Sequence, residues 1–146
     1  MIRYLDNTDS ITPEQLKGFF VGWPNPPTPA THLRLLRQSA AVVLAVDDAT
    51  GVVVGFINAV SDGVLCAYIP LLEVLPAWQG QGIGRLLVAR MLARLAPLYA
   101  IDLLCDVELQ PFYAKLGMRP AIGMMMRNYA RQNGEGIALY AGCGAA

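Results

Sequence analysis

Three alternating glycines, Gly80, Gly82 and Gly84, stand in the stretch "AWQGQGIGRLL", between a predicted strand and a predicted helix. Glycine gives the backbone conformations that other residues avoid, so several N–H groups can turn toward one point. The positive end of the helix dipole would lie behind those N–H groups. The stretch therefore predicts a loop that binds an anionic group such as phosphate. Tight packing of the helix on a sheet is the alternative reason for the glycines.

Two familiar nucleotide-binding patterns do not fit this stretch. A Walker A loop needs Lys followed by Ser or Thr after its last glycine, whereas Arg85 and Leu86 follow Gly84. The dinucleotide pattern G-x-G-x-x-G, counted from Gly80, would need a glycine where Arg85 stands. Asp102 follows at a suitable distance, but the strands predicted before the loop are antiparallel. An NAD-dependent oxidoreductase is therefore the weaker alternative.

The elements before the glycines are predicted to be two helices and three antiparallel strands. The first helix begins near Pro13, and the second begins at "THLRLLRQS" with Thr31 as its cap, after the Pro-rich loop "GWPNPPTPA". Residues 41–62 form two β-branched runs around an Asp/Gly turn, which predicts a hairpin. Residues 63–75 form the third strand, with a bulge or an edge at Pro70.

After the glycines, the apolar spacing predicts a helix from Ile83 that ends at Pro97. Three further elements are predicted: a buried strand over 99–107, a short helix over 109–118 closed by Gly117, and a last strand over 123–130. Asp106 is expected to cap the short helix or to touch substrate. The "MMM" run is expected in the core of that last strand. Residues 131–146 are expected to form a flexible tail or an edge strand. The order predicts one α+β domain over 1–146, with a single mixed, mainly antiparallel sheet flanked by helices.

The composition narrows the classes of partner. Of the 146 residues, 55% are hydrophobic and 15% are charged, so an ordered core is expected. Eleven basic residues balance eleven acidic ones, which argues against a domain that binds nucleic acid by neutralising phosphates. Neither a signal-like start nor an apolar run long enough for a membrane is present, and we expect a cytoplasmic protein without membrane contact.

The cysteines favour structural thiols over a metal site. Cys66, Cys105 and Cys143 are odd in number and far apart, and the sequence has one histidine. A zinc site needs four ligands at closer spacing. We therefore expect no bound metal. The apolar composition and the Gly/Ala-rich tail are compatible with a homodimer.

The glycine stretch resembles the acetyl-CoA-binding motif of the GCN5-related N-acetyltransferase (GNAT) superfamily, written Q/R-x-x-G-x-G/A and matched by Gln79, Gly82 and Gly84. A Val, a Pro and an aromatic residue precede it as they commonly do in that family, at Val74, Pro76 and Trp78. The stretch "PFYAKLGM", residues 111–118, resembles the second hallmark of the family, an aromatic pair in a short helix before a Leu-Gly step. In order of elements the resemblance runs from Val42 to Arg127.

The resemblance implies acetyl-CoA as cosubstrate and a fold whose central strand splays from its neighbour. The pantetheine arm would pair with the exposed backbone at Leu72 and Val74, and the pyrophosphate would lie on the N–H groups from Gln79 to Gly84, with Arg85 adding charge. The cofactor-binding residues expected from the resemblance are Leu72, Val74, Gln79, Gly80, Gln81, Gly82, Ile83, Gly84 and Arg85.

The reaction implied is direct attack of a neutral amine on the acetyl thioester. Tyr113 stands where the family often has a tyrosine beside the CoA sulfur, and would protonate the departing thiolate; ordinary packing is its alternative. Glu73 is the one charged residue between Asp62 and Arg85, and a desolvated carboxylate there could take the amine proton. Alternatively, Glu73 faces solvent or pairs with Arg85 or Arg119.

The acceptor pocket of the family is built largely from the N-terminal helices and the loop between them. Here that region supplies Phe19, Phe20, Trp23, His32 and several prolines, with few acidic residues. The resemblance therefore implies a small or aromatic amine, an amino acid or a peptide N-terminus, rather than a polycation. A non-catalytic module that binds or senses acyl-CoA on the same fold is the alternative function.

Overall fold

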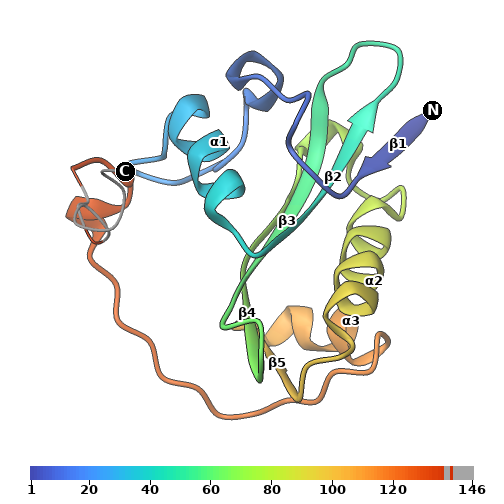
Figure 1. Ribbon diagram of the computed structural model, residues 1–146, viewed down its shortest axis with the longest axis vertical. Coiled ribbons are helices and arrows are strands. Elements are labelled where there is room, and N and C mark those ends of the chain that lie inside the picture. The colour runs from blue at the N-terminus through green and yellow to red at the C-terminus, as the bar shows by residue number, and fades with distance from the viewer. Residues whose placement is uncertain (137–138, 140–146) are drawn as a thin grey trace.

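The protein is described by a computed structural model that places residues 1–136 and 139 (Figure 1). Five strands run over β1 (Ile2–Leu5), β2 (Ala41–Asp47), β3 (Val53–Ser61), β4 (Cys66–Val74) and β5 (Ala100–Asp102). The α-helices are α1 (Pro29–Gln38), α2 (Ile83–Leu95) and α3 (Gln110–Ala114). Short 3-10 helices are η1 (Pro13–Leu16), η2 (Pro76–Trp78), η3 (Val107–Leu109) and η4 (Tyr129–Arg131).

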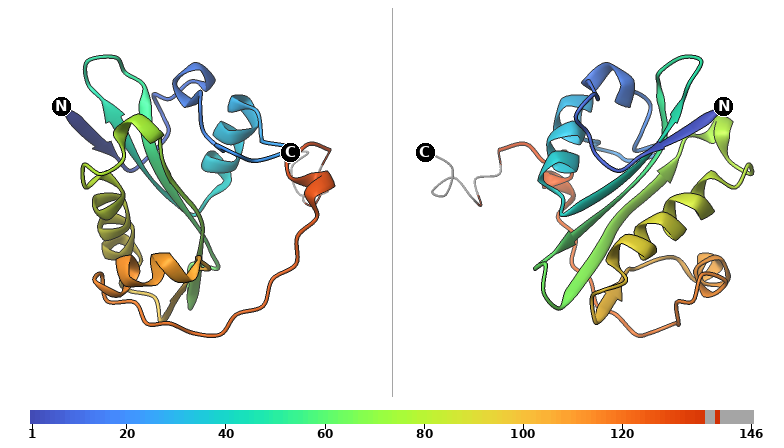
Figure 2. Two further views of the ribbon diagram at one scale, coloured as in Figure 1. Left: turned by 180° about the vertical axis from the view of Figure 1, so that it is seen from behind. Right: turned by 45° about the vertical axis from the view of Figure 1, so that its right-hand side comes forward.

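The five strands form one mixed sheet in the order β1-β2-β3-β4-β5. The first four strands pair antiparallel, and β4 pairs with β5 in parallel. Helix α1 and η1 cover one face of the sheet, while α2 and α3 cover the other (Figure 2). The predicted α+β fold with a single, mainly antiparallel sheet flanked by helices is confirmed.

Both faces of the central strands are buried because helices cover both sides. Every residue of β2 is buried, and one apolar face of α2 supplies Ile83, Leu87, Val88, Met91 and Leu95 to the core. These helix positions recur at i, i+4, i+5, i+8 and i+12, a stripe along one side of α2. The predicted hairpin over 41–62 and the predicted helix from Ile83 are confirmed.

Helix α1 begins one turn earlier than the sequence predicted. Thr28, rather than Thr31, is the N-cap, and its side chain accepts a hydrogen bond from the Thr31 N–H at 3.1 Å. Pro29 occupies the first helical position, where its missing N–H has no cost. The predicted helix near Pro13 is a single 3-10 turn, held by a capping box between Thr12 and Gln15.

The bulge predicted near Pro70 is present, since the pairing of β3 with β4 shifts between Asn58 and Val60. The strand predicted over 99–107 is much shorter, because β5 covers Ala100–Asp102 alone. A strand that the sequence did not predict, β1, pairs with β2 and makes four strands before the glycines instead of three.

The predicted last strand over 123–130 is wrong. Residues 119–128 have no regular secondary structure and run outside the sheet, and Met124, Met125 and Met126 are exposed instead of buried in a strand core. Of the predicted tail, residues 131–136 contain the end of η4 and pack near α1, with no strand among them. The rest of the tail, including Cys143, lies outside the described residues. In the part of the chain that the structure describes, no helix is long and apolar enough to span a membrane.

Candidate active site

The glycine loop joins β4 to α2 through the 3-10 turn η2. Gly80 and Gly82 have φ of +75° and +81°, in the left-handed region that favours glycine, and Gly82 is the N-cap of α2. A Cβ built on either glycine would meet no atom within 4 Å, so the space above them is open. These two glycines therefore turn the backbone, and no side chain of their own covers the backbone groups of the loop.

A row of amide groups is exposed along this turn. Within residues 1–136 and 139, none of the N–H groups of residues 80–85 donates a backbone hydrogen bond, and the first helical bond of α2 runs from the Leu86 N–H to the Gly82 C=O at 3.1 Å. The Gln79 N–H is instead used within η2, where it bonds to the Pro76 C=O at 3.3 Å. Six consecutive free amides at a helix N-terminus form a cradle for an anion. This cradle begins one residue later than the Gln79–Gly84 span expected from the sequence.

The side chain of Gln79 ties the loop to β4. Its Nε2 donates to the Val74 C=O at 2.9 Å, so one backbone acceptor of β4 is already occupied. Arg85 is exposed in the first turn of α2, next to the free amides. Gly84 lies against Val74 and Phe112, at 3.7 and 3.9 Å from the position of a built Cβ, which connects the cradle to the helix that carries Tyr113.

Strands β4 and β5 separate along their length. They pair over Cys66–Tyr68 and Ala100–Asp102 alone, whereas β3 continues to pair with β4 as far as Val74. In the described chain, the second half of β4, which contains Leu72 and Glu73, therefore has no strand on its β5 side. This is the splayed strand that the sequence led us to expect.

A cleft of about 600 Å³ opens beside the splayed half of β4. Its size lies in the range of small-molecule sites. It brings together Leu72, Glu73 and Gln79 from β4 and the glycine loop, and aromatic rings from the N-terminal region and β3. The lining residues are Phe20, Val21, Trp23, Phe56, Leu71, Leu72, Glu73, Pro76, Gln79, Asp106 and Leu109.

Glu73 is half-buried in this cleft and holds the backbone of the N-terminal loop. Its carboxylate accepts hydrogen bonds from the Phe20 N–H at 2.8 Å and the Val21 N–H at 3.2 Å. Phe20 has φ of +62°, the one positive value among the described non-glycine residues. Such a conformation is strained and needs support from its surroundings. Glu73 supplies that support, and it forms an ion pair with neither Arg85 nor Arg119 in the described structure.

Tyr113 lies in α3, partly buried against the core and edge-to-face with Phe112 at 4.9 Å between ring centroids. Burial raises the pKa of the Tyr113 hydroxyl, and the neighbouring Cys105 adds to the rise. Its phenol is therefore protonated at neutral pH. Tyr113 does not line the cleft that contains Glu73; Leu109, one turn earlier, does.

Asp106 occupies a position that the sequence left undecided. It precedes η3 as the N-cap residue, yet its side chain makes no capping bond, and it lines the same cleft as Glu73. The capping role for the Tyr113 helix is therefore wrong. The cleft is also lined by Val21, Phe56 and Leu109, which the sequence did not single out. Their positions follow from the tertiary fold, and no local motif marks them.

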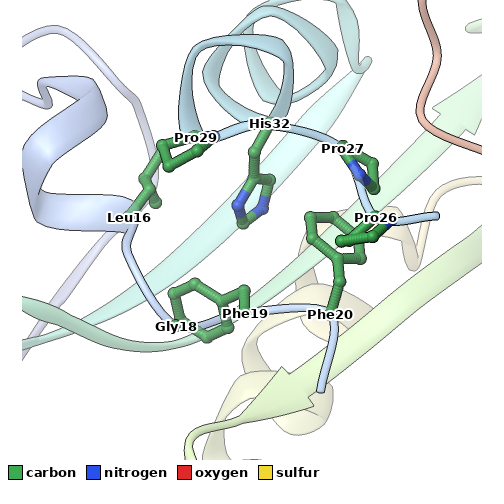
Figure 3. A pocket seen from close by; sticks show the side chains of 8 residues that line it. All are labelled: Leu16, Gly18, Phe19, Phe20, Pro26, Pro27, Pro29 and His32. Atoms are coloured by element: carbon green, nitrogen blue, oxygen red, sulfur yellow. The ribbon is translucent and has the colours of Figure 1, made fainter. Parts of the chain in front are cut away.

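Phe19 and His32 do not line the cleft but contact aromatic residues that do. His32 is 1% exposed, and its ring packs on Phe56, Phe20 and Phe19 at centroid distances of 4.3, 4.8 and 5.4 Å. Figure 3 shows its imidazole pointing into a small cavity of about 70 Å³ between the Pro-rich loop and η1. Burial lowers the pKa of His32 to about 4, so the ring is neutral at pH 7.

The amide cradle, the splayed strand and the adjoining cleft occur together on one α+β fold. The family model "Acetyltransferase (GNAT) family" matches residues 8–118. The chain therefore belongs to the GNAT acetyltransferase family and is an acetyltransferase enzyme.

Relatives of known sequence and structure agree with this assignment. The chain is 29% identical over 119 residues to an uncharacterized N-acetyltransferase, ycf52, of Porphyra purpurea, covering 78% of this chain and 68% of the relative. A crystal structure from Deinococcus radiodurans, assigned as an acetyltransferase, is 48% identical with a TM-score of 0.87, over 90% of this chain and 92% of that chain. A GNAT-family acetyltransferase of Streptococcus pneumoniae is 28% identical with a TM-score of 0.71, over 88% and 98%.

Proposed function

We propose that this enzyme moves the acetyl group of acetyl-CoA to a primary amine of a small molecule or peptide by direct attack. One observation carries the proposal: a row of six free amides at the start of α2 adjoins an acidic, aromatic cleft along the unpaired half of β4. A polyanionic donor and a cationic acceptor would meet where these two surfaces join.

The donor would bind mainly through backbone groups. The pyrophosphate of CoA would accept hydrogen bonds from the amides of residues 80–85, with the guanidinium of Arg85 adding charge. The pantetheine arm would lie along the free side of β4 at Leu72 and Val74, as an added strand does at a sheet edge. Gln79 would hold the loop in place, since its side chain already bonds to the Val74 C=O.

In the reaction, the amine nitrogen attacks the thioester carbonyl carbon; the new C–N bond forms and the C–S bond breaks. Glu73 would take the proton that the amine loses, directly or through water, because each carboxylate oxygen that accepts one amide still has a free lone pair. A backbone N–H between Leu72 and Val74 would stabilise the oxyanion. The Tyr113 hydroxyl would protonate the thiolate, and the raised pKa of Tyr113 keeps that proton available.

The cleft favours an acceptor with one positive charge and an apolar or aromatic body. Its charged lining residues are Glu73 and Asp106, both acidic, while Phe20, Trp23 and Phe56 supply aromatic surface. A protonated amine would be attracted by the two carboxylates, and the rings would contact the rest of the molecule. A polyamine or aminoglycoside would bring more charges than the cleft can pair.

Release of free CoA thiol from acetyl-CoA across a panel of amines tests this proposal. The panel should include aromatic monoamines, amino acids, short peptides, a polyamine and an aminoglycoside. We expect turnover with aromatic monoamines or peptide N-termini, and little with the polycations. Binding of acetyl-CoA with no turnover on any amine would contradict the proposal and favour a non-catalytic binding module. Tighter binding of NAD than of CoA would contradict the identification of acetyl-CoA as the donor.

Substitutions of Glu73 separate catalysis from support of the loop. Glu73→Gln keeps a carbonyl oxygen that can accept one loop amide but cannot take a proton, whereas Glu73→Ala loses both functions. If Glu73 is the base, Glu73→Gln lowers kcat by about 100-fold or more with a small change in melting temperature. A Glu73→Gln enzyme with wild-type kcat would remove Glu73 from the chemistry and leave it as the anchor of Phe20.

A further inference from the structure

His32 is a polar residue at a position where the fold needs an apolar one. It lies on the buried face of α1 together with Leu33 and Leu36, and it is 1% exposed. Among the described residues, neither of its ring nitrogens has a hydrogen-bond partner. A leucine at this position would avoid the cost of burying an unpaired polar group. Packing of the core therefore does not explain this residue, and another role has to be sought.

The aromatic neighbours of His32 cannot supply the missing partner. Three phenyl rings contact the imidazole, and the nearest, Phe56, lies at 4.3 Å between centroids. A phenyl face can receive an N–H weakly, but it has no O–H or N–H to offer to the second nitrogen. Because burial lowers the pKa of His32 to about 4, the ring is neutral at pH 7 and has one donor and one acceptor nitrogen. The acceptor nitrogen needs a donor that the surrounding rings lack.

The imidazole points into a cavity of about 70 Å³ (Figure 3). Among the described residues that line this cavity, His32 has the one polar side chain; the others are three prolines, two phenylalanines, a leucine and a glycine. A benzene molecule occupies a cavity of about 150 Å³, so a whole aromatic ring is too large here. The volume suits a polar group on roughly two or three carbon atoms.

The chemistry of the cavity selects a hydroxyl group. A hydroxyl both donates and accepts, so it can pair with the neutral imidazole in either tautomer. A carboxylate or phosphate only accepts, and its charge would find no opposite charge in the lining. An ammonium group would lose its hydration without a carboxylate to replace it, and an alkyl group would leave the imidazole unpaired.

Phe20 connects this cavity to the cleft of the proposed active site. The residue lines both of them. Its backbone N–H donates to Glu73 Oε2 at 2.8 Å, and its ring lies 4.8 Å from the imidazole of His32 between centroids. One residue therefore separates the proposed base from the unpaired imidazole. A short carbon chain with an amine at one end would have its other end near His32.

We propose that the cavity at His32 binds a hydroxyl group at the far end of the acceptor, so that the enzyme prefers amino alcohols to alkylamines of the same length. This inference rests on the proposed transferase function and names the class of its acceptor. The amine would lie at Glu73, the carbon chain would pass Phe20, and the hydroxyl would pair with the imidazole. A site with a buried polar group rejects an analogue that lacks the matching hydroxyl, because the buried group is then left unpaired.

A matched pair of acceptors tests the preference. Aminopentanol and hexylamine have chains of the same length, with a hydroxyl on the first where the second has a methyl group. We expect kcat/KM for aminopentanol to exceed that for hexylamine about 10-fold or more. His32→Leu removes both ring nitrogens and should abolish the preference, whereas His32→Gln keeps a donor and an acceptor and should retain part of it. Leu36→Val, at a buried position of α1 outside the cavity, is the matched control and should keep the preference of the wild type.

Nuclear magnetic resonance tests the contact itself, in the presence of CoA, which has no acetyl group to transfer. The chain has one histidine, so the imidazole signals belong to one residue. Nuclear Overhauser contacts should join the imidazole C–H protons of the wild type to the CH₂OH protons of aminopentanol.

The outcomes separate this inference from the proposed function. Turnover of both amines with equal kcat/KM, a preference that survives in His32→Leu, or aminopentanol without contacts to the imidazole would each overturn the inference; the first of these is also the result for a cavity that takes up water alone. In these cases the transferase function stands as long as amines are acetylated. Contacts at His32 without turnover of either amine would retain the hydroxyl site and contradict the transferase function.

Discussion

Burial of His32 makes the stability of this protein depend on pH below neutrality. The ring is 1% exposed, is surrounded by Phe19, Phe20 and Phe56, and neither of its nitrogens has a hydrogen-bond partner in the described chain. Protonation would put an unpaired charge among phenyl rings. Burial therefore lowers the pKa of His32 from 6.5 in the unfolded chain to about 4 in the folded protein.

The direction of the effect follows from where each state takes up the proton. As the pH falls through 6.5 the unfolded chain becomes protonated at His32, while the folded protein remains neutral until about pH 4. The unfolded state therefore binds more protons in this window, and the free energy of unfolding decreases as the pH falls. With about 1.4 kcal/mol for each pKa unit, the contribution of His32 lost between pH 7 and pH 4 is about 3 kcal/mol.

The measurement is urea denaturation at pH 7, 6, 5 and 4, followed by the fluorescence of Trp23 and Trp78, for the wild type and His32→Phe. Phenylalanine has no titrating group, and the cavity beside His32 has about 70 Å³ to receive the larger ring. Carboxyls whose pKa is lowered in the fold, such as Asp47 and Asp62, also cost stability in acid, but they do so equally in both proteins. The wild type should lose about 3 kcal/mol more than the variant between pH 7 and pH 4. Parallel pH curves for the two proteins would refute the reasoning.

Three further substitutions test the site and the core. Tyr113→Phe should lower kcat about 100-fold with unchanged acetyl-CoA affinity, measured by thiol release and calorimetry, with the exposed Tyr99→Phe as control; an unaltered rate would exclude Tyr113 as the acid. Gly82→Trp should abolish acetyl-CoA binding in calorimetry, because the side chain would fill the open space above the amides, whereas Gly63→Trp, at a remote turn with similar backbone, should bind normally. Leu87→Ala, at a fully buried position, should destabilise the fold by about 3 kcal/mol in urea titrations, and the half-exposed Leu86→Ala by much less; equal losses would contradict the burial pattern of α2.

The elements predicted well from the sequence are those whose signals are local. The hairpin over 41–62 has its turn residues between two β-branched runs, and α2 has both its apolar spacing and its glycine start within a short stretch. The cradle follows from the same stretch, since the left-handed backbone at Gly80 and Gly82 is a property of glycine itself. For these elements the tertiary fold agrees with the local preference.

The features that the sequence did not predict depend on distant partners. Strand β1 has four residues and becomes a strand by pairing Ile2 with Asp47 and Leu5 with Leu44. The hydrogen bonds of Glu73 to Phe20 and Val21 join positions more than fifty residues apart, so no local pattern announces them. Residues 123–130 show the reverse case: their apolar residues predicted a strand, but among the described residues this segment pairs with no strand of the sheet.

The chain has no net charge, but positive and negative groups are separated within the proposed site. Eleven basic and eleven acidic residues leave no net charge to attract either substrate over a distance. In the proposed site, the donor side would be formed by the free amides of 80–85 and the positive end of α2, and the acceptor side would include Glu73 and Asp106. Backbone dipoles act over short range, so each substrate would be selected after it enters its half of the site. A protein of this kind should therefore bind acetyl-CoA with a weaker dependence on salt than one that holds the pyrophosphate with a cluster of lysines and arginines.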